Sequence, residues 1–295
     1  MLIRKRHLLV FMLSAASCTN LEAQEIDPYN TDSGKPKDIY GYQLVWNDEF
    51  SVDGKPSPES WKCEEGFVRN KELQWYQLDN AKCSGGVLTI EGRREKVSNP
   101  NYNPTSSDWK KNRQFAEYTS ASIKSVGLRE FLYGRFEIRA KIDVAKGAWP
   151  AIWTLGNSME WPSCGEVDLL EYYIANGVPS ILANVASGTN TRWNAKWNSK
   201  ITPLSHFIEK DPNWASKFHV WRMDWTPDSI NLYLDDELLN TTLLTNTLNA
   251  DGSQPFHQPQ YILLNLALGE NGGDPSQSKF PITFQVDYVR VYQKK

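Results

Sequence analysis

The chain has 295 residues and a formal net charge of −3 at pH 7. This mildly acidic balance provides no basic footprint, which argues against nucleic acid as a partner. The length allows one or two domains. Twelve tryptophans are more than an ordinary core uses, which leaves some of them free to line a binding surface.

The N-terminus has the pattern of a secretory signal. Basic residues at 4–6 precede an apolar run at 8–13, and small residues follow at 14–17. The apolar run is too short to span a bilayer stably, so this pattern predicts export rather than a membrane-spanning helix.

Cys18 comes directly after the small residues, and its setting resembles the lipidation site of bacterial lipoproteins. The favoured interpretation is a signal peptide over residues 1–18 that ends at a lipidated Cys18, followed by a tether over residues 19–39. The chain would then be anchored at the cell surface through the lipid alone. Cleavage after Ala23 is the alternative, and it would release a secreted or periplasmic chain without an anchor.

Residues 40–295 form a single predicted all-β domain. Alternating or β-rich runs predict strands at residues 87–91, 136–142, 166–171, 230–235 and 284–292. Long helical periodicity is absent, and we expect at most a helical turn or two at 213–218. The stretch at 98–111 is rich in Asn, Pro and Ser and is interpreted as a long loop near a groove, not as a linker. A β-sandwich is the economical architecture.

The strand at 166–171 carries three acids among apolar residues. Side chains alternate faces along a strand, so Glu166 and Asp168 share one face and Glu171 falls on the other. A β-bulge around Leu169–Leu170 would return Glu171 to the face of the other two. We therefore predict a bulge that brings all three carboxyl groups onto one surface.

Like charges at such range cannot all ionise at neutral pH, so one carboxyl keeps its proton while another is a free carboxylate. This pairing suits cleavage of a glycosidic bond, with Glu166 as nucleophile and Glu171 as acid/base. A separation of roughly 5 to 5.5 Å would favour the retaining mechanism. Asp168 would hydrogen-bond and orient the nucleophile. For such an acid pattern alone, a calcium site or a solvated strand edge is the alternative.

The residues around the acids favour the catalytic interpretation. Trp149, Trp153 and Trp161 precede the acids, and Tyr172–Tyr173 follow them. Aromatic faces stack on the apolar faces of sugar rings, so tryptophans beside paired acids suit a polysaccharide cleft.

Ordered motifs along the chain resemble glycoside hydrolase family 16, in particular its laminarinase and mixed-linkage β-glucanase branches. The resemblance runs from about residue 40 to the end. It rests on residues 46–50, 70–76, 118–120, 133–137, 147–155, 161–173, 218–221, 225–228, 258–265 and 286–292. It implies a β-jelly-roll sandwich of the concanavalin A type, with a concave sheet carrying an open groove. It also implies Glu166 as nucleophile, Asp168 as its assistant and Glu171 as acid/base.

Five residues are predicted to bind substrate. The resemblance implies Asn70, Trp149 and Trp161. Trp193 and Trp197 lie in a polar loop, where two large rings are hard to explain as core. The alternative for these two is that they tuck under the loop. Trp153 is expected to pack in the core.

Two departures from the resemblance bear on the substrate. Laminarinases often carry arginine where this chain has Ser122, and a histidine on the strand where it has residues 183–187. We therefore expect a monomeric endo-β-glucanase acting on mixed-linkage β-1,3/1,4-glucan, with strict β-1,3-glucanase activity on laminarin as the alternative. Sulfated galactans are less expected as substrates, because they would favour a basic groove and this chain is mildly acidic. A non-catalytic glycan-binding surface protein is the alternative of another class.

No cofactor is expected, because the four histidines have no zinc-ligand spacing. The resemblance leaves a structural calcium open near Glu49 and Asp287, although both are more readily interpreted as structural residues. In an exported protein a Cys63–Cys83 disulfide is open as well, which would leave Cys164 as a packed, buried thiol.

Overall fold

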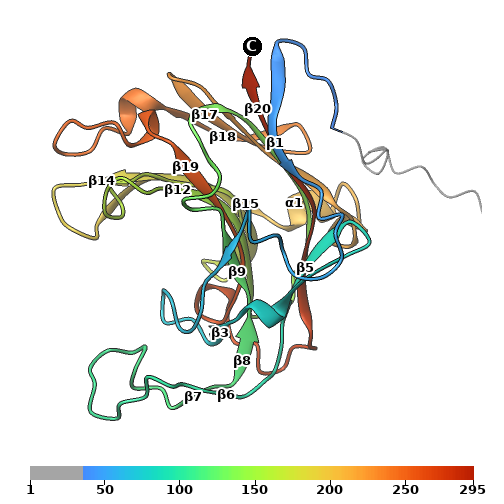
Figure 1. Ribbon diagram of the computed structural model, residues 1–295, viewed down its shortest axis with the longest axis vertical. Helices are drawn as coiled ribbons and strands as arrows, with labels where there is room; N and C mark the ends of the chain where they lie inside the picture. Colours follow the sequence, from blue (N-terminus) through green and yellow to red (C-terminus); the bar gives the residue numbers. More distant parts are fainter. Residues whose placement is uncertain (1–35) are drawn as a thin grey trace, which may run out of the picture.

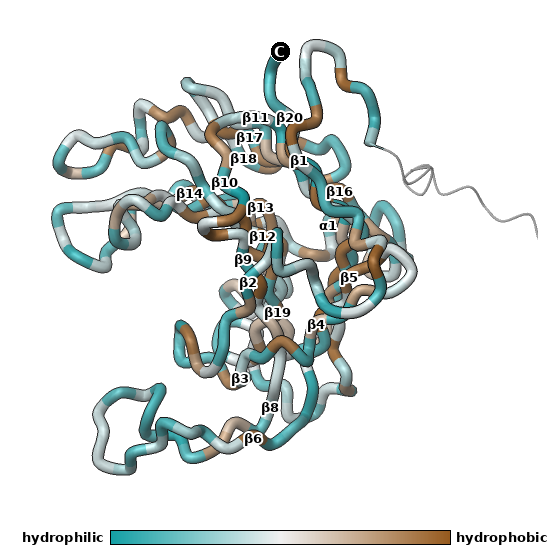
Figure 2. The backbone as a smooth tube through the Cα atoms, in the orientation of Figure 1, coloured by the Kyte–Doolittle hydropathy of each residue, from teal (hydrophilic) through white to brown (hydrophobic). Residues whose placement is uncertain are grey.

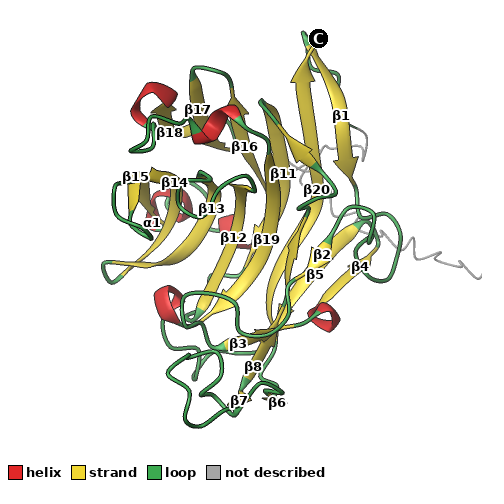
Figure 3. Cartoon of the chain, turned by 60° about the vertical axis from the view of Figure 1, so that its left-hand side comes forward, coloured by secondary structure: helices red, strands yellow, loops and turns green. Residues whose placement is uncertain are grey.

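The computed structural model describes residues 36–295, and the predicted signal peptide, Cys18 and most of the tether lie outside them. Two eight-stranded sheets stack face to face (Figures 1 and 3). The outer sheet has the order β18(Glu237–Leu243), β17(Ser229–Leu234), β16(His219–Trp225), β11(Gly134–Ile142), β20(Ile282–Lys294), β5(Val87–Gly92), β4(Ala81–Ser84), and β1(Tyr42–Asp48) pairs with β20. Its strands all pair antiparallel, as expected of a jelly-roll sandwich.

The second sheet carries the groove described below. Its order is β15(Ala195–Pro203), β14(Val178–Gly188), β13(Glu166–Ala175), β12(Ala148–Gly156), β19(Gln260–Leu268), β9(Ser122–Lys124), β2(Lys62–Cys63), and β10(Glu130–Phe131) pairs with β19. Two short pairs complete the strands, β3(Gln74–Tyr76) with β8(Tyr118–Ser120) and β6(Val97–Ser98) with β7(Phe115–Ala116). All five predicted strands are present.

Helical structure is confined to single turns. The short helix α1(Ser205–Ile208) was not predicted, and the 3₁₀ turns are η1(Leu78–Asn80), η2(Trp214–Ser216), η3(Leu244–Asn246), η4(Pro255–His257) and η5(Glu270–Gly272). The turn η2 lies inside the predicted helical segment at 213–218. Within residues 36–295, no helix is long and apolar enough to cross a membrane.

The core lies between the two sheets, and it explains why buried and more exposed side chains alternate along their strands. In β16 the side chains at 219, 221, 223 and 225 point inward, and those between them are partly exposed. Phe136 and Val289 of the outer sheet are fully buried together with Ile152, Leu170 and Leu264 of the groove sheet. Hydrophobic stretches accordingly concentrate in the central strands, while the chain around β6 is hydrophilic (Figure 2).

The loop between β6 and β7 projects from one end of the molecule (Figure 1). Its last residues are anchored, because Arg113 donates to the carbonyls of Lys71 (2.6 Å) and Glu72 (2.5 Å) and stacks on Phe67 and Trp109. None of residues 98–111 lines the groove, but the contact of Arg113 with Glu72 ties the end of this loop to a residue that does.

Candidate active site

The three acids lie on β13, and a bulge places them on one face as predicted. Glu166 pairs with Ala186 and Asp168 with Asn184 on β14, and the register then shifts so that Glu171 pairs with Leu182. The register with β12 shifts at the same place, between Ile152 and Trp153. Leu169 and Leu170 are both buried in the core, while all three acids line the groove.

Glu166 and Asp168 form a coupled pair. The indole Nε1 of Trp161 donates to Glu166 Oε2. Burial raises the pKa of Glu166, while the hydrogen bonds from Trp161 and Asp168 and the charge of Arg69 oppose this rise. Asp168 is only 2% exposed, and burial followed by the charges of Glu171 and Glu166 raises its pKa well above the usual value. The rise in pKa is larger at Asp168, so Asp168 is the member of the pair that more readily keeps a proton and can share it with Glu166.

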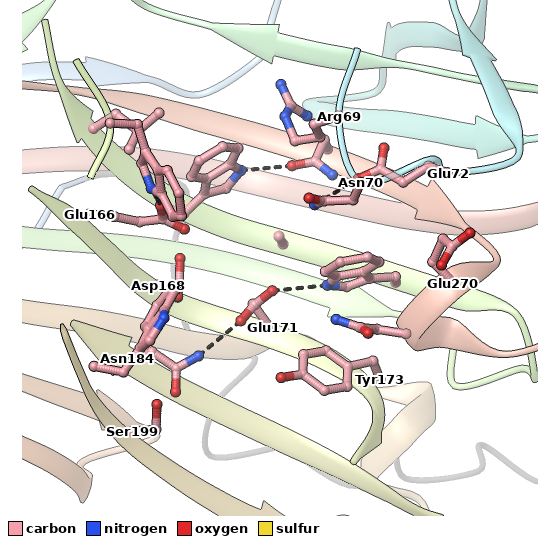
Figure 4. A pocket seen from close by; sticks show the side chains of 18 of the residues that line it. Arg69, Asn70, Glu72, Glu166, Asp168, Glu171, Tyr173, Asn184, Ser199 and Glu270 are labelled. Carbon is pink, nitrogen blue, oxygen red and sulfur yellow. Dashed lines mark hydrogen bonds between the residues drawn. The ribbon is translucent and has the colours of Figure 1, made fainter. Parts of the chain in front are cut away.

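Glu171 has a different environment. Trp149 Nε1 donates to its Oε1 (2.9 Å), and Asn184 Nδ2 donates to its Oε2 (2.8 Å), as Figure 4 shows. Burial raises the pKa of Glu171 to about 7, and the charge of Glu166 adds to this rise. At neutral pH the site can thus hold a carboxylate at Glu166 and a proton available at Glu171, which is the combination that acid-assisted nucleophilic substitution requires.

A groove of about 780 Å³ runs over these acids. All five residues predicted to bind substrate line it, namely Asn70, Trp149, Trp161, Trp193 and Trp197. Trp193 is 56% exposed and Trp197 is 46% exposed, so the alternative that they tuck under their loop is wrong. Trp193 stacks on Trp161 with ring centroids 6.5 Å apart, and Trp197 lies on β15. Open aromatic faces beside paired acids suit a chain of sugar rings.

The family profile of the glycosyl hydrolases family 16 matches residues 91–290, which contain the three acids. The chain belongs to glycosyl hydrolase family 16. It is a glycoside hydrolase, and its sandwich fold agrees with solved structures of that family.

Relatives of this family 16 member include several glucanases. The chain is 34% identical over 271 residues to a β-glucanase of Rhodothermus marinus, with 85% of each chain covered. It is 32% identical to SCLam, a non-specific endo-β-1,3(4)-glucanase, with a TM-score of 0.70 and 88% and 95% of the two chains covered. It is 34% identical to a structure from work on endo-acting O-glycanases that prominent human gut microbiota express to initiate mucin breakdown. There the TM-score is 0.79, and the coverage is 88% of this chain and 94% of that one.

In this family 16 member Trp153 packs in a small buried apolar cluster, as expected, and it also reaches the groove. Its ring lines the groove, although it is only 8% exposed, and the Arg69 guanidinium lies 5.1 Å from the ring centroid. Trp153 Nε1 donates to Asn265 Oδ1 (2.7 Å), and Asn265 Nδ2 donates to the hydroxyl of Tyr76 (3.2 Å). Trp153 is therefore part of the groove floor.

Glu72 also lines the groove, although no role was predicted for it. It is buried and accepts hydrogen bonds from Gln74 Nε2 (2.7 Å), Asn70 Nδ2 (3.3 Å) and the Tyr76 hydroxyl (3.3 Å). Burial raises its pKa. Glu72 thereby ties the predicted sugar ligand Asn70 to the network below Trp153.

Arg69 is the second groove residue for which no role was predicted. It pairs with Glu64, which also accepts from Ser122 Oγ (2.7 Å) and from Lys124 Nζ (3.1 Å). Burial acts to raise the pKa of Glu64, but the charge of Arg69 acts against it, and the net result is a lowered pKa. Ser122, where the sequence departs from laminarinases, thus supports an arginine that reaches the groove from another segment.

The two residues considered for calcium are engaged with arginines. Both carboxylate oxygens of Glu49 accept from Arg290 (2.9 Å each), and Asp287 accepts from Arg139 (2.7 Å). These carboxylates already have cationic partners, which agrees with a structural role for both residues. In residues 36–295 no group of three or more His, Cys, Asp or Glu side chains is arranged to hold a metal.

The considered disulfide is wrong. Cys63 and Cys83 are both free thiols, and they lie on β2 and β4, which belong to different sheets. Burial raises the pKa of each thiol to about 11. Cys164 is buried and does not line the groove, in agreement with its interpretation as a packed thiol.

Proposed function

We propose that this family 16 enzyme is a retaining endo-β-glucanase that hydrolyses mixed-linkage β-1,3/1,4-glucan, with laminarin as a secondary substrate. The observation that carries the proposal is the bulge in β13. It sets a hydrogen-bonded carboxylate, Glu166, and an acid with a pKa of about 7, Glu171, on one face of an open groove. An open groove lets a polysaccharide chain bind across it, which suits internal cleavage.

In this mechanism Glu166 attacks the anomeric carbon while Glu171 gives its proton to the glycosidic oxygen, so the bond to the leaving sugar breaks as a covalent glycosyl-enzyme forms. Asp168 donates a hydrogen bond to Glu166 and orients it. Glu171, now ionised, takes a proton from water, whose oxygen attacks the same carbon and releases Glu166. The anomeric configuration is retained after two inversions.

The linkage preference rests on two observations. The glucanase relatives include a non-specific endo-β-1,3(4)-glucanase. The strand after the acids has no histidine, and its Asn184 donates a hydrogen bond to Glu171. Ser122 stands where laminarinases often have an arginine, so two features typical of strict β-1,3-glucanases are missing. Strict laminarinase activity is the first alternative.

A second candidate function is endo-cleavage of mucin-type O-glycans. It is favoured by the TM-score of 0.79 to the structure from the O-glycanase work, higher than the 0.70 found for SCLam. A binding protein without activity is the alternative of another class, and it gives no reason for the cost of burying three carboxyl groups beside one another.

Digestion of barley mixed-linkage glucan, laminarin, cellulose and desialylated mucin O-glycans side by side tests these functions. We expect short mixed-linkage oligosaccharides from barley glucan to appear first, with laminarin cleaved more slowly, as resolved by chromatography over time. Faster laminarin cleavage would make the enzyme a β-1,3-glucanase, and cleavage of the mucin glycans alone would assign it to the second candidate. If none of the four substrates is cleaved but glycan binding is retained, the result would support a binding protein without activity.

We also propose that the enzyme is exported and anchored at the cell surface through a lipid on Cys18. The proposal rests on the signal pattern of residues 1–17 and on the residues directly before Cys18. Intact-mass analysis of the membrane fraction is expected to find a chain that begins at an acylated Cys18, and Cys18→Ser should move the enzyme out of that fraction. An unacylated wild-type chain beginning at Gln24 would refute the anchor.

A further inference from the structure

A glycine-rich turn after β19 forms one margin of the groove. Gly269 N donates to Gly147 O (2.9 Å), and Gly147 N donates to Gly272 O (2.7 Å). A Cβ added at Gly272 would lie 2.7 Å from Gly147 O, closer than atoms can approach. The turn is therefore pinned against the start of β12, the strand whose Trp149 donates to Glu171.

Glu270, within this turn, has a backbone conformation that L-residues rarely adopt. Its φ is 45°, although the turn around it is built from glycines that adopt such angles freely. Two other groove residues, Asn70 (φ 54°) and Trp193 (φ 64°), share this feature. Non-glycine residues held in this region cost free energy, and they gather at ligand-binding sites. A glutamate at position 270 therefore carries a backbone cost that a glycine would avoid.

The Glu270 carboxylate has no hydrogen bond or ion pair with any residue in the described part of the chain. The charge of Arg113 acts on it, but that guanidinium is engaged with the carbonyls of Lys71 and Glu72. Figure 4 shows Glu270 at the margin of the pocket, on the side of Glu72 and Tyr173 and away from Glu166. Asn271, the next residue, also lines the groove.

We propose that Glu270 and Asn271 form a sugar-binding margin of the groove that recognises neutral rings and rejects anionic ones. A free carboxylate can accept hydrogen bonds from two neighbouring sugar hydroxyls, and bonds to an ionised acceptor are stronger than neutral ones. The same charge repels a sulfate or carboxylate substituent, so selectivity has a repulsive part as well as an attractive one. This inference rests on the proposed function and extends it to the substituents that the glucan can carry.

The first test compares Glu270→Gly and Glu270→Gln with wild type on barley glucan. Glycine removes the carboxylate and suits the backbone angle, so the turn is preserved; alanine would not preserve it. We expect KM to rise about tenfold in Glu270→Gly and less in Glu270→Gln, with kcat within about twofold of wild type, because a hydrogen bond to a charged group is lost. Glu59→Gln, an exposed acid outside the groove, is the matched control and should change neither constant.

The second test measures inhibition by carboxymethylated barley glucan. We expect Glu270→Gln to bind this anionic glycan at least about threefold more tightly than wild type while it binds the neutral glucan more weakly, because the repulsion is relieved as the acceptor is lost. A purely structural role in the turn would weaken both. Unchanged KM in both variants, or inhibition that moves in the same direction as KM, would overturn the inference.

The two proposals can fail separately. If wild type cleaves barley glucan and the Glu270 variants behave as wild type, the sugar-binding role of the groove margin is refuted, whereas the proposed glucanase function is retained. If wild type leaves barley glucan and laminarin intact but cleaves the mucin glycans, the glucanase is refuted. The same variants are then compared on desulfated and sulfated forms of that substrate. We again expect Glu270→Gln to bind the anionic form more tightly and the neutral form more weakly than wild type.

Discussion

Glu166→Ala is expected to lose at least roughly 10⁴-fold in kcat on barley glucan, because removal of a covalent nucleophile leaves only binding and acid assistance. The loss should fall on kcat, since in the proposed mechanism Glu166 attacks the anomeric carbon and the groove residues proposed to hold the rest of the glucan are untouched. Azide fits the space left by the shortened side chain and can attack in its place. The measurement is rescue by sodium azide, with the product identified as a glycosyl azide of inverted configuration.

Two variants complete this experiment. Glu209→Gln, an exposed acid away from the groove, should behave as wild type. Asp168→Asn keeps Glu166 but replaces the group that orients it, so its loss should be smaller than that of Glu166→Ala and azide should not restore it. Residual wild-type-like activity in Glu166→Ala without rescue would assign the nucleophile to another residue.

The bulge in the strand of the three acids was predictable because regular alternation of side chains would not place all three acids on one face. Alternation alone separates Glu171 from Glu166 and Asp168, and only an inserted residue brings the three together. The register of β13 against both neighbours shifts at this point, and Leu169 joins Leu170 in the core. The bulge followed from the assumption that the acids act together, and the hydrophobic pattern then fixed where it lies.

The support of the acids was less predictable. Trp149 and Trp161 were expected to offer ring faces to sugars, yet each uses its indole N–H to hold a carboxylate. The sequence indicates that a tryptophan lies near an acid but not which edge points toward it. The network of Glu72, Asn265 and Trp153 joins segments almost 200 residues apart, and no local spacing signals such contacts.

The wrong disulfide has a related cause. Twenty residues separate Cys63 from Cys83, a spacing that many bridges have, and export would favour oxidation. In the fold, β2 lies at the end of the groove sheet and β4 at the end of the outer sheet, and both thiols are free. Sheet assignment of such short edge strands depends on long-range pairing, which their own composition does not encode.

Glu171→Gln is expected to lower kcat on barley glucan by roughly 10²- to 10⁴-fold, the usual contribution of general acid catalysis. Glutamine keeps the hydrogen bond from Asn184 or Trp149 but has no proton to give to the glycosidic oxygen. An aryl glycoside whose phenolate leaves without protonation should still form the glycosyl-enzyme in this variant. The measurement is therefore the ratio of the loss on polysaccharide to the loss on the aryl glycoside, which should be far above one.

The pH profile gives an independent readout of the same group. Because Glu171 must carry its proton in the first step, wild-type kcat/KM should fall as the pH rises through its pKa of about 7. In Glu171→Gln this fall should vanish, whereas the acidic limb, set by protonation of Glu166, should persist. A basic limb that stays in Glu171→Gln, together with equal losses on both substrates, would show that another group donates the proton and that Glu171 acts only through its charge on Glu166.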